Sequence, residues 1–288
     1  AEKISATDLH QRMPPPPAQD EIGRLTEVLN EMFDRLQRSF EQVTRFTSDA
    51  SHELKTPLSL MQAEVENALD SDSLASEHRQ LLSDLSEQCS RLSQIIDGLL
   101  FLSRADDSHL VLAQEPVDLV RLARELMEDA EILAEPAGLT LECQLADEVV
   151  TRGDQCLLAR AAMNLIDNAI KHNRPGGRVT IAAAVEKDRA VLRISNTGPG
   201  LAPGAGAQIF DRFYRGDPSH SNEIPGHGLG LSIAREIARA HGGDVLLVRS
   251  DSEWTEFRLV LPLLPGAALA VRERERDRLT EGPPLRPG

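Results

Sequence analysis

Apolar residues recur at alternating spacings of three and four between residues 25 and 50, which predicts one long amphipathic helix with a heptad seam. The seam consists of Leu25, Leu29, Met32, Leu36, Val43, Phe46 and Ala50, with Ser39 filling one gap. Asp20 and Glu21 precede the seam, and acidic residues suit the N-terminus of a helix. The pattern continues to about Leu69, where the Ser- and Asp-rich run 70–76 ends it.

A second apolar stripe follows this break and predicts a partner helix. Its members are Leu82, Leu85, Leu92, Ile96 and Leu99. Two antiparallel helices, each with a continuous apolar face, form only half of a stable core. We therefore expect the hairpin to complete a four-helix bundle with a second copy of the chain, as a homodimer.

Beyond residue 109 the pattern changes to short strands mixed with helices. Strands are expected at 109–115, 140–145, 149–152, 178–185, 190–194, 245–248 and 255–261, and helices from 118, at 154–172 and at 229–241. Hairpins mixed with helices predict an α/β sandwich, in which the helices cover one face of a largely antiparallel sheet. The expected fold is therefore multidomain, an all-α antiparallel helical hairpin followed by an α/β sandwich.

Composition narrows the possible functions. A length of 288 residues suits two modules, and 41% hydrophobic with 3% aromatic residues predicts aliphatic cores. The net charge of -15 argues against nucleic-acid binding, which needs basic stripes. Three cysteines without metal or redox spacing fit a reducing, cytoplasmic setting. No apolar run approaches the roughly 18 residues of a membrane span.

The first candidate for chemistry is His52, which interrupts the amphipathic helix. It lies two residues from both Ala50 and Leu54, about 160° around the helix from each, so it is expected to face solvent. Glu53 is adjacent and Thr56 lies one turn further on. Pro57 is expected to kink the helix, because it lacks an N–H donor. The pattern alone also fits a solvated surface histidine on a kinked helix.

A polar stripe runs beside the buried stripe of the helix expected at 154–172. It consists of Asn164, Asn168 and Lys171, at positions i, i+4 and i+7. Asparagine disfavours helix interiors, so two on one stripe suggest a binding role. Amide oxygens suit a hard cation and a lysine suits phosphate, although two solvated asparagines remain the alternative.

Two glycine-rich turns flank a segment with aromatic rings and arginines. Residues 196–200, Asn-Thr-Gly-Pro-Gly, follow a strand, and Gly198 and Gly200 would let the backbone approach a ligand closely. Residues 226–230, Gly-His-Gly-Leu-Gly, precede a helix whose free N–H groups could hold phosphate. Between them, residues 209–215 read Ile-Phe-Asp-Arg-Phe-Tyr-Arg. Each segment alone also fits an ordinary turn or a loop anchor.

Taken in order, these five segments resemble the H, N, G1, F and G2 boxes of bacterial sensor histidine kinases. The resemblance covers about residues 38–264, and residues 20–32 resemble the second half of a HAMP module more weakly. It implies the C-terminal part of a HAMP linker at 1–38, a dimerisation and histidine phosphotransfer hairpin at 39–106, an ATP-binding catalytic domain at 107–264 and a disordered tail at 265–288. In the family, HAMP follows a transmembrane helix, which implies a sensor at the cytoplasmic face of the bacterial inner membrane.

The resemblance also implies a mechanism. His52 would accept the γ-phosphoryl group of ATP with Mg²⁺ present, and would pass it to an aspartate of a response regulator. Glu53 would act as general base, Thr56 would position water for dephosphorylation of the regulator, and Arg215 would stabilise charge. The residues implied in nucleotide binding are Asn164, Asn168, Lys171, His172, Asn196, Gly198, Gly200, Gly226, His227, Gly228, Leu229 and Gly230, with Asn168 and Asn164 on the metal.

One residue departs from the family pattern, because Asn196 stands where the G1 box usually has aspartate. An amide can flip, so we expect weaker discrimination between adenine and guanine than with a carboxylate. One rival reading is a catalytically inactive dimeric scaffold that binds a response regulator, and His52, Asn168 and the glycines argue against it. A second is an ATPase of the gyrase or mismatch-repair type, which the H box ahead of the ATP-binding region and the acidic charge balance disfavour.

Overall fold

The computed structural model describes residues 21–69, 76–106, 110–146, 148–202, 204–216 and 226–264, with the side chain of His52 among those left out. The chain divides into two compact units, residues 1–109 and 110–288. The expected tail at 265–288 lies outside the described residues, as do residues 1–20 of the expected HAMP part.

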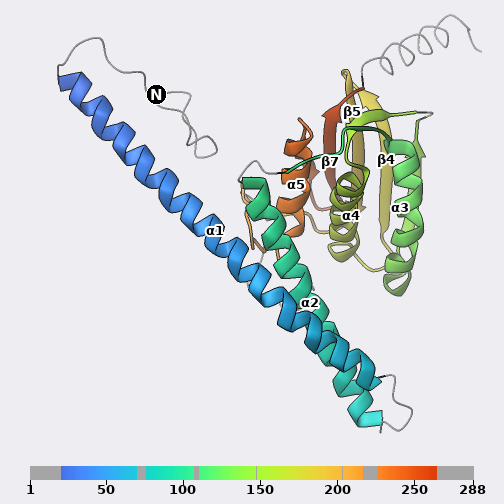
Figure 1. Cartoon of the computed structure of the whole chain (residues 1–288). Helices are drawn as coiled ribbons and strands as arrows, with labels where there is room; N and C mark the ends of the chain where they lie inside the picture. The colour runs from blue at the N-terminus through green and yellow to red at the C-terminus, as the bar shows by residue number, and fades with distance from the viewer. Residues whose placement is uncertain are drawn as a thin grey trace, which may run out of the picture. The chain divides into compact units, whose positions relative to one another are not determined.

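The first unit is a hairpin of two helices, α1 (Glu21–Leu69) and α2 (Ser76–Asp106), which lie against each other in Figure 1. This confirms the predicted helical hairpin. α1 continues through Pro57 to Leu69, so the proline does not end the helix. Leu58, Ile96 and Leu100 form the buried contact between the helices. None of the described helices has the length and apolarity needed to cross a membrane.

Much of the apolar surface of this hairpin is uncovered. Between residues 54 and 92 of the hairpin, the exposed large apolar side chains are Leu54, Leu60, Met61, Leu81, Leu85 and Leu92. Leu85 and Leu92 belong to the stripe that the sequence predicts on the buried face of the second helix. Their exposure in a single chain agrees with the expectation that two helices make only half of a core.

The second unit is built on a five-stranded sheet with the order β2-β4-β5-β7-β6. The strands are β2 (Thr140–Leu145), β4 (Arg178–Glu186), β5 (Arg189–Thr197), β6 (Asp244–Ser250) and β7 (Trp254–Pro262). Only β2 and β4 pair in parallel, and the other neighbours are antiparallel. This confirms the predicted, largely antiparallel sheet.

A separate two-stranded sheet joins β1 (Glu115–Asp118) to β3 (Val150–Gly153). The strand expected at 109–115 is wrong, because the described residues 110–114 have no regular structure. A strand needs a partner along its length, and on this side the four residues of β3 pair with 115–118, while Thr151 also bridges to Leu263. Val117 is buried there, whereas Val111 is exposed.

Three helices lie on one face of the five-stranded sheet, α3 (Leu119–Ala134), α4 (Gln155–Lys171) and α5 (Gly230–Ala240) (Figure 1). Short 3-10 turns at Glu135–Ala137 and Ala205–Ala207 complete the unit. Asp118 and Asp154 cap α3 and α4 by accepting hydrogen bonds from the backbone of Val120 and Leu157. The core between helices and sheet is mainly aliphatic, as predicted, and Phe257 is its one fully buried aromatic side chain in the described part.

Candidate functional site

α4 carries two predicted site residues on the flank of its buried stripe. Leu158, Leu165 and Ala169 are fully buried, while Asn164 and Asn168 are half-buried. The Nδ2 atom of Asn164 is buried and finds no hydrogen-bond partner in the described part of the chain. A side chain built at Gly230 would meet Asn164 Oδ1 at 3.9 Å. The asparagine stripe therefore lies against the first turn of α5, which follows the G2 segment.

The end of α4 brings two basic side chains to the same place. Lys171 Nζ contacts Asp167 Oδ2 at 2.6 Å, one turn back on the helix. Desolvation and the nearby positive charge of Lys171 hold the pKa of His172 below its ordinary value. Arg215 acts on the pKa of His172 in the same direction, so its charge lies within electrostatic range. Lys171 and Arg215 thus both lie within electrostatic range of His172, and Asp167 opposes their effect on its pKa.

Asn196 lies at the end of β5 with 3% of its surface exposed. Its Nδ2 donates hydrogen bonds to the carbonyl oxygens of His172, at 3.2 Å, and Thr197, at 3.0 Å. Both neighbours can only accept, so the amide nitrogen must face them and the amide oxygen must point away. These two bonds hold the amide in one orientation, in which its oxygen is the atom left to accept, as a carboxylate oxygen would. The discrimination between adenine and guanine stays a prediction.

The glycines of the G1 turn are required by contacts within the protein. A side chain at Gly198 would come within 2.5 Å of the His172 carbonyl oxygen, and one at Gly200 within 2.3 Å of the Asp251 carbonyl oxygen. Gly200 also has φ of 72°, which favours glycine. Close backbone packing explains both glycines, and at Gly198 it holds the turn against the end of α4.

A polar network beside Asn196 was not predicted from the sequence. Thr197 Oγ1 donates to Asn173 Oδ1 at 2.7 Å and accepts from the Arg178 backbone N–H at 2.8 Å. Asn173 Nδ2 in turn donates to the Arg178 carbonyl oxygen at 3.1 Å. These bonds join the end of α4 to β4 and β5. An asparagine directly after a helix C-terminus was the available signal, since its side chain readily bonds to nearby backbone.

The F and G2 segments touch through their backbones. The Phe213 N–H donates to the Gly228 carbonyl oxygen at 2.9 Å. A side chain at Gly228 would lie 2.7 Å from the carbonyl carbon of Phe213 and from the carbonyl oxygen of Tyr214. Both partners have positive φ, 68° at Gly228 and 62° at Phe213. Gly228 is therefore needed for this contact. Of its neighbours, Leu229 is buried and Gly226 and His227 are half-buried.

Aromatic contacts anchor the F segment to the domain. The Arg235 guanidinium of α5 lies 4.5 Å from the centroid of the Phe210 ring. Arg235 also forms two hydrogen bonds with Asp244, at 2.8 and 3.1 Å. The Phe210 ring meets Phe257 edge-on, with centroids 6.3 Å apart. This fits the interpretation of the segment as a loop anchor, alongside its place in the site.

The H segment belongs to the other unit and lies within α1. Glu53 and Thr56 are exposed, whereas the side chain of His52 lies outside the described residues. The solvent-facing orientation of His52 therefore stays a prediction. Lys55 Nζ contacts Asp97 Oδ1 at 2.5 Å, which links α1 to α2 one turn beyond residue 52.

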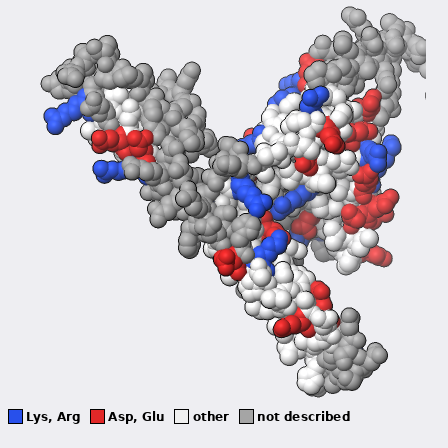
Figure 2. Space-filling view, viewed as in Figure 1, with Lys and Arg blue, Asp and Glu red and all other residues white. Residues whose placement is uncertain are grey.

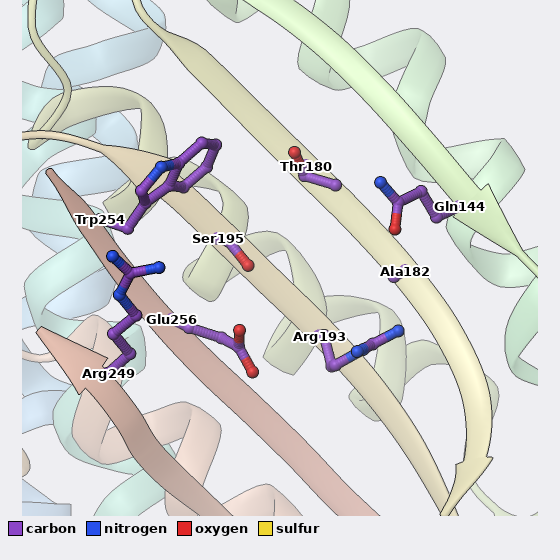
Figure 3. Close-up of a pocket in the computed structure, with 8 residues that line it drawn as sticks. All are labelled: Gln144, Thr180, Ala182, Arg193, Ser195, Arg249, Trp254 and Glu256. Atoms are coloured by element: carbon purple, nitrogen blue, oxygen red, sulfur yellow. The ribbon is translucent and has the colours of Figure 1, made fainter.

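A hollow of about 190 Å³ lies in the uncovered face of the sheet (Figure 3). It is lined by Gln144, Thr180, Ala182, Arg193, Ser195, Arg249, Trp254 and Glu256. Side chains alternate along a strand, so Arg193 faces this side while Leu192 and Ile194 are buried under the helices. None of the predicted site residues lines the hollow.

The charges around the hollow are largely paired among themselves. Arg249 bonds to Asp251 and holds the pKa of that carboxyl at about 2, and Arg258 bonds to Glu256 at 2.6 Å. Figure 2 shows basic and acidic side chains interspersed on the visible face of the described residues, with no continuous basic stripe.

Comparison with known proteins identifies the parts of the chain. Residues 153–265 match the model of the histidine kinase-, DNA gyrase B- and HSP90-like ATPases. Residues 42–108 match the His Kinase A (phospho-acceptor) domain, and residues 1–38 match the HAMP domain. The chain belongs to the bacterial sensor histidine kinases.

Individual sensor proteins are similar over most of this chain. Sensor protein IrlS of Burkholderia pseudomallei (strain K96243) is 35% identical over 262 residues, which cover 91% of this chain and 56% of IrlS. The probable sensor protein PcoS of Escherichia coli is 37% identical over 245 residues, which cover 85% of this chain and 52% of PcoS. The chain thus spans little more than half the length of these two relatives.

A solved structure supports the fold. Full-length ShkA, crystallised in complex with AMPPNP, superposes with a TM-score of 0.66 and 26% identity. The match covers 76% of this chain and 46% of ShkA. A helical phosphoacceptor region followed by an α/β ATPase domain is therefore the architecture of this chain.

The residues present fit a magnesium ion held together with a nucleotide. Among the described residues, no three His, Cys, Asp or Glu side chains gather into a metal cluster. Mg²⁺ needs few protein ligands when substrate phosphates supply the others, and amide oxygens are suitable donors. Asn164 and Asn168 offer such oxygens from one stripe of α4, where both side chains are half-buried.

Proposed function

We propose that the chain is the kinase portion of a two-component sensor, which transfers the γ-phosphoryl group of Mg-ATP to His52 and then to an aspartate of a response regulator. The observation that supports this best is the convergence of the predicted nucleotide residues. The backbone carbonyl of His172 meets both Asn196 and Gly198, and Arg215 acts electrostatically on the same residue. Segments far apart in sequence therefore meet at one corner of the ATPase-type domain.

On this proposal each part of the corner has a role in binding. The oxygen of Asn196 accepts a hydrogen bond from the adenine amino group. Asn168 and Asn164 hold Mg²⁺ together with the phosphates, and Lys171, His172 and Arg215 supply positive charge. Gly198 and Gly200 shape the adenine side, and the turn of Gly226, His227, Gly228, Leu229 and Gly230 shapes the phosphate side.

The transfer step moves one phosphoryl group between two nucleophiles. Glu53 takes the proton from one ring nitrogen of His52, and the other nitrogen attacks the γ-phosphorus. The bond between the γ-phosphorus and the bridging oxygen breaks, and ADP leaves. Bound Mg²⁺ supplies charge neutralisation on the phosphates. Glu53 is exposed in α1, beside the residue from which it would take the proton.

The same hairpin would serve the later steps. The phosphohistidine donates its phosphoryl group to a receiver aspartate, and Thr56, one turn from His52, positions water for hydrolysis of the phosphorylated regulator. Removal of the Thr56 hydroxyl in Thr56→Ala should slow this hydrolysis and leave autophosphorylation largely intact. A regulator that loses phosphate at the native rate with this variant would exclude such a role.

Dimerisation and membrane attachment complete the proposal. The exposed apolar side chains of the hairpin, among them Leu60 at 62% and Leu81 at 58% exposure, support a homodimeric four-helix bundle. The HAMP match at residues 1–38 supports attachment to the cytoplasmic face of the bacterial inner membrane through a preceding helix. An inactive scaffold that only binds a regulator is the alternative, and the outward acceptor of Asn196 speaks against it.

Incubation of the full chain with γ-labelled ATP and Mg²⁺ tests the proposal. We expect label that is released by acid and stable to base, as for a phosphorus–nitrogen bond. His52→Gln should bind ATP with native affinity and acquire no label, because acceptor and nucleotide site lie in different units. Label on this variant would exclude His52 as the acceptor, and ATP binding without label on the native chain would favour the scaffold.

A further inference from the structure

The contact between Lys55 and Asp97 lies about one helical turn from His52, where the negative charge of a phosphoryl group would act on it. It joins α1 to α2 across 42 residues of sequence, with Nζ and Oδ1 2.5 Å apart. About half of each side chain is exposed, 52% for Lys55 and 45% for Asp97. An exposed ion pair adds little to stability and is readily exchanged. The pair is therefore a weak contact whose partners can change.

Lys55 lies three residues after His52 on a continuous helix. Residues at this spacing are neighbours on the helix surface, about one turn apart. The lysine ammonium is mobile on its four-carbon stem and carries three donors. A phosphoryl group on residue 52 would add close to two negative charges within its reach. It would thus compete with Asp97 for the same cation.

We propose that Lys55 is a positioning residue that exchanges partners, binding Asp97 while His52 is unmodified and the phosphoryl group once His52 is phosphorylated. This inference rests on the proposed function. Two consequences follow from thermodynamic linkage, because a residue that binds the phosphoryl group must also stabilise the phosphorylated state. Lys55 stabilises phosphorylated protein plus ADP relative to unmodified protein plus ATP. Asp97 opposes phosphorylation because it binds Lys55 in the unmodified state.

The equilibrium between ATP and phosphohistidine measures this effect directly. The full chain is equilibrated at set ratios of ATP to ADP, and the phosphorylated fraction gives the equilibrium constant of the transfer. Lys55→Gln should lower this constant and Asp97→Asn should raise it, each by about twofold to fivefold, the range of one exposed ion pair. Lys55→Arg keeps the charge and should stay close to native.

The double variant distinguishes partner exchange from simple repulsion. If Asp97 acts by holding Lys55, Asp97→Asn has no effect in the Lys55→Gln background. If the carboxylate only repels the phosphoryl group, the two effects add, and the exchange is refuted. Equal constants for the native chain and both single variants would also refute it.

A second link between the same helices provides a matched control. Gln62 Nε2 approaches Ser90 Oγ at 3.5 Å, two turns further along α1. Gln62→Ala should leave the equilibrium constant unchanged, and a change as large as that of Lys55→Gln would assign both effects to hairpin stability.

A separate donor keeps the inference testable if ATP is not used. Potassium phosphoramidate phosphorylates imidazole without a nucleotide site: its phosphorus–nitrogen bond breaks, a new one forms to the ring, and ammonia leaves. The order of phosphohistidine yields among the variants should be the same with this donor, with His52→Gln as the blank. A phosphohistidine yield that does not depend on Lys55 refutes the partner exchange. Phosphorylation by phosphoramidate but not by ATP refutes the proposed kinase activity. In that case the order of yields among the variants still decides the partner exchange.

Discussion

Replacement of Asn196 by aspartate tests how the G1 turn recognises a base. In the native chain both N–H groups of the amide are bonded to carbonyl oxygens, of His172 at 3.2 Å and of Thr197 at 3.0 Å. Asn196→Asp removes both donors and sets a carboxylate oxygen against two other oxygens. Two lost hydrogen bonds at about 1 kcal/mol each, together with the facing acceptors, predict a loss of about 2–4 kcal/mol in the free energy of unfolding.

Denaturation of the ATP-binding unit can be followed without a label. Trp254 is the only tryptophan in the chain, and it pairs with Thr197 next to the substituted residue. Its fluorescence in a urea titration therefore reports on this unit. Gln144→Glu makes the same amide-to-acid change at an exposed position of β2 and should alter the unfolding free energy by less than about 0.5 kcal/mol.

Base selectivity follows from the same hydrogen bonds. Because the amide oxygen is fixed outwards, it accepts from the adenine amino group and opposes the guanine carbonyl oxygen, at a cost of about 1–3 kcal/mol. The native chain should therefore prefer ATP to GTP by about fivefold or more, and the aspartate variant should show a similar ratio. Calorimetric titration of both nucleotides into both proteins measures these affinities.

Two outcomes would refute the argument for a fixed amide. Equal affinity of the native chain for ATP and GTP, with strong ATP preference in Asn196→Asp, would mean that the amide flips. An unchanged unfolding free energy in the aspartate variant would mean that the two hydrogen bonds contribute nothing.

Three further predictions concern Glu53, the contact between the F and G2 segments, and His172. Glu53→Ala should bind ATP normally and transfer the phosphoryl group about 10²–10⁴-fold more slowly, as for loss of a general base, and an unchanged single-turnover rate would exclude that role. Gly228→Ala should push the G2 turn from Phe213 and lower ATP affinity at least tenfold (about 1.4 kcal/mol), whereas Gly216→Ala, which meets nothing within 4 Å, should bind as native. The lowered pKa of His172 means that the unfolded chain binds more protons near pH 6.5, so acidification from pH 7.5 to 5.5 should destabilise the native chain more than His172→Asn.

The chain's local patterns were enough to place most of its helices and strands. The heptad seam predicted α1, and Asp118 and Asp154 marked the helix starts where they act as caps. The expected strand at 109–115 failed because alternation shows only that a segment can pair, whereas the partner strand decides whether it does. β3 is four residues long and fixed the strand at 115–118.

The order of the five boxes identified the family and supplied the proposed site residues, because these motifs are local in sequence. Their spacing could not show what each side chain touches. The orientation of the Asn196 amide depends on the His172 carbonyl, 24 residues away, and the need for glycine at 228 depends on the backbone of the F segment. Lys55 finds Asp97 across 42 residues. Periodicity and caps act within a few turns and can be read along the chain, whereas donors, acceptors and close contacts between distant segments exist only once the chain has folded.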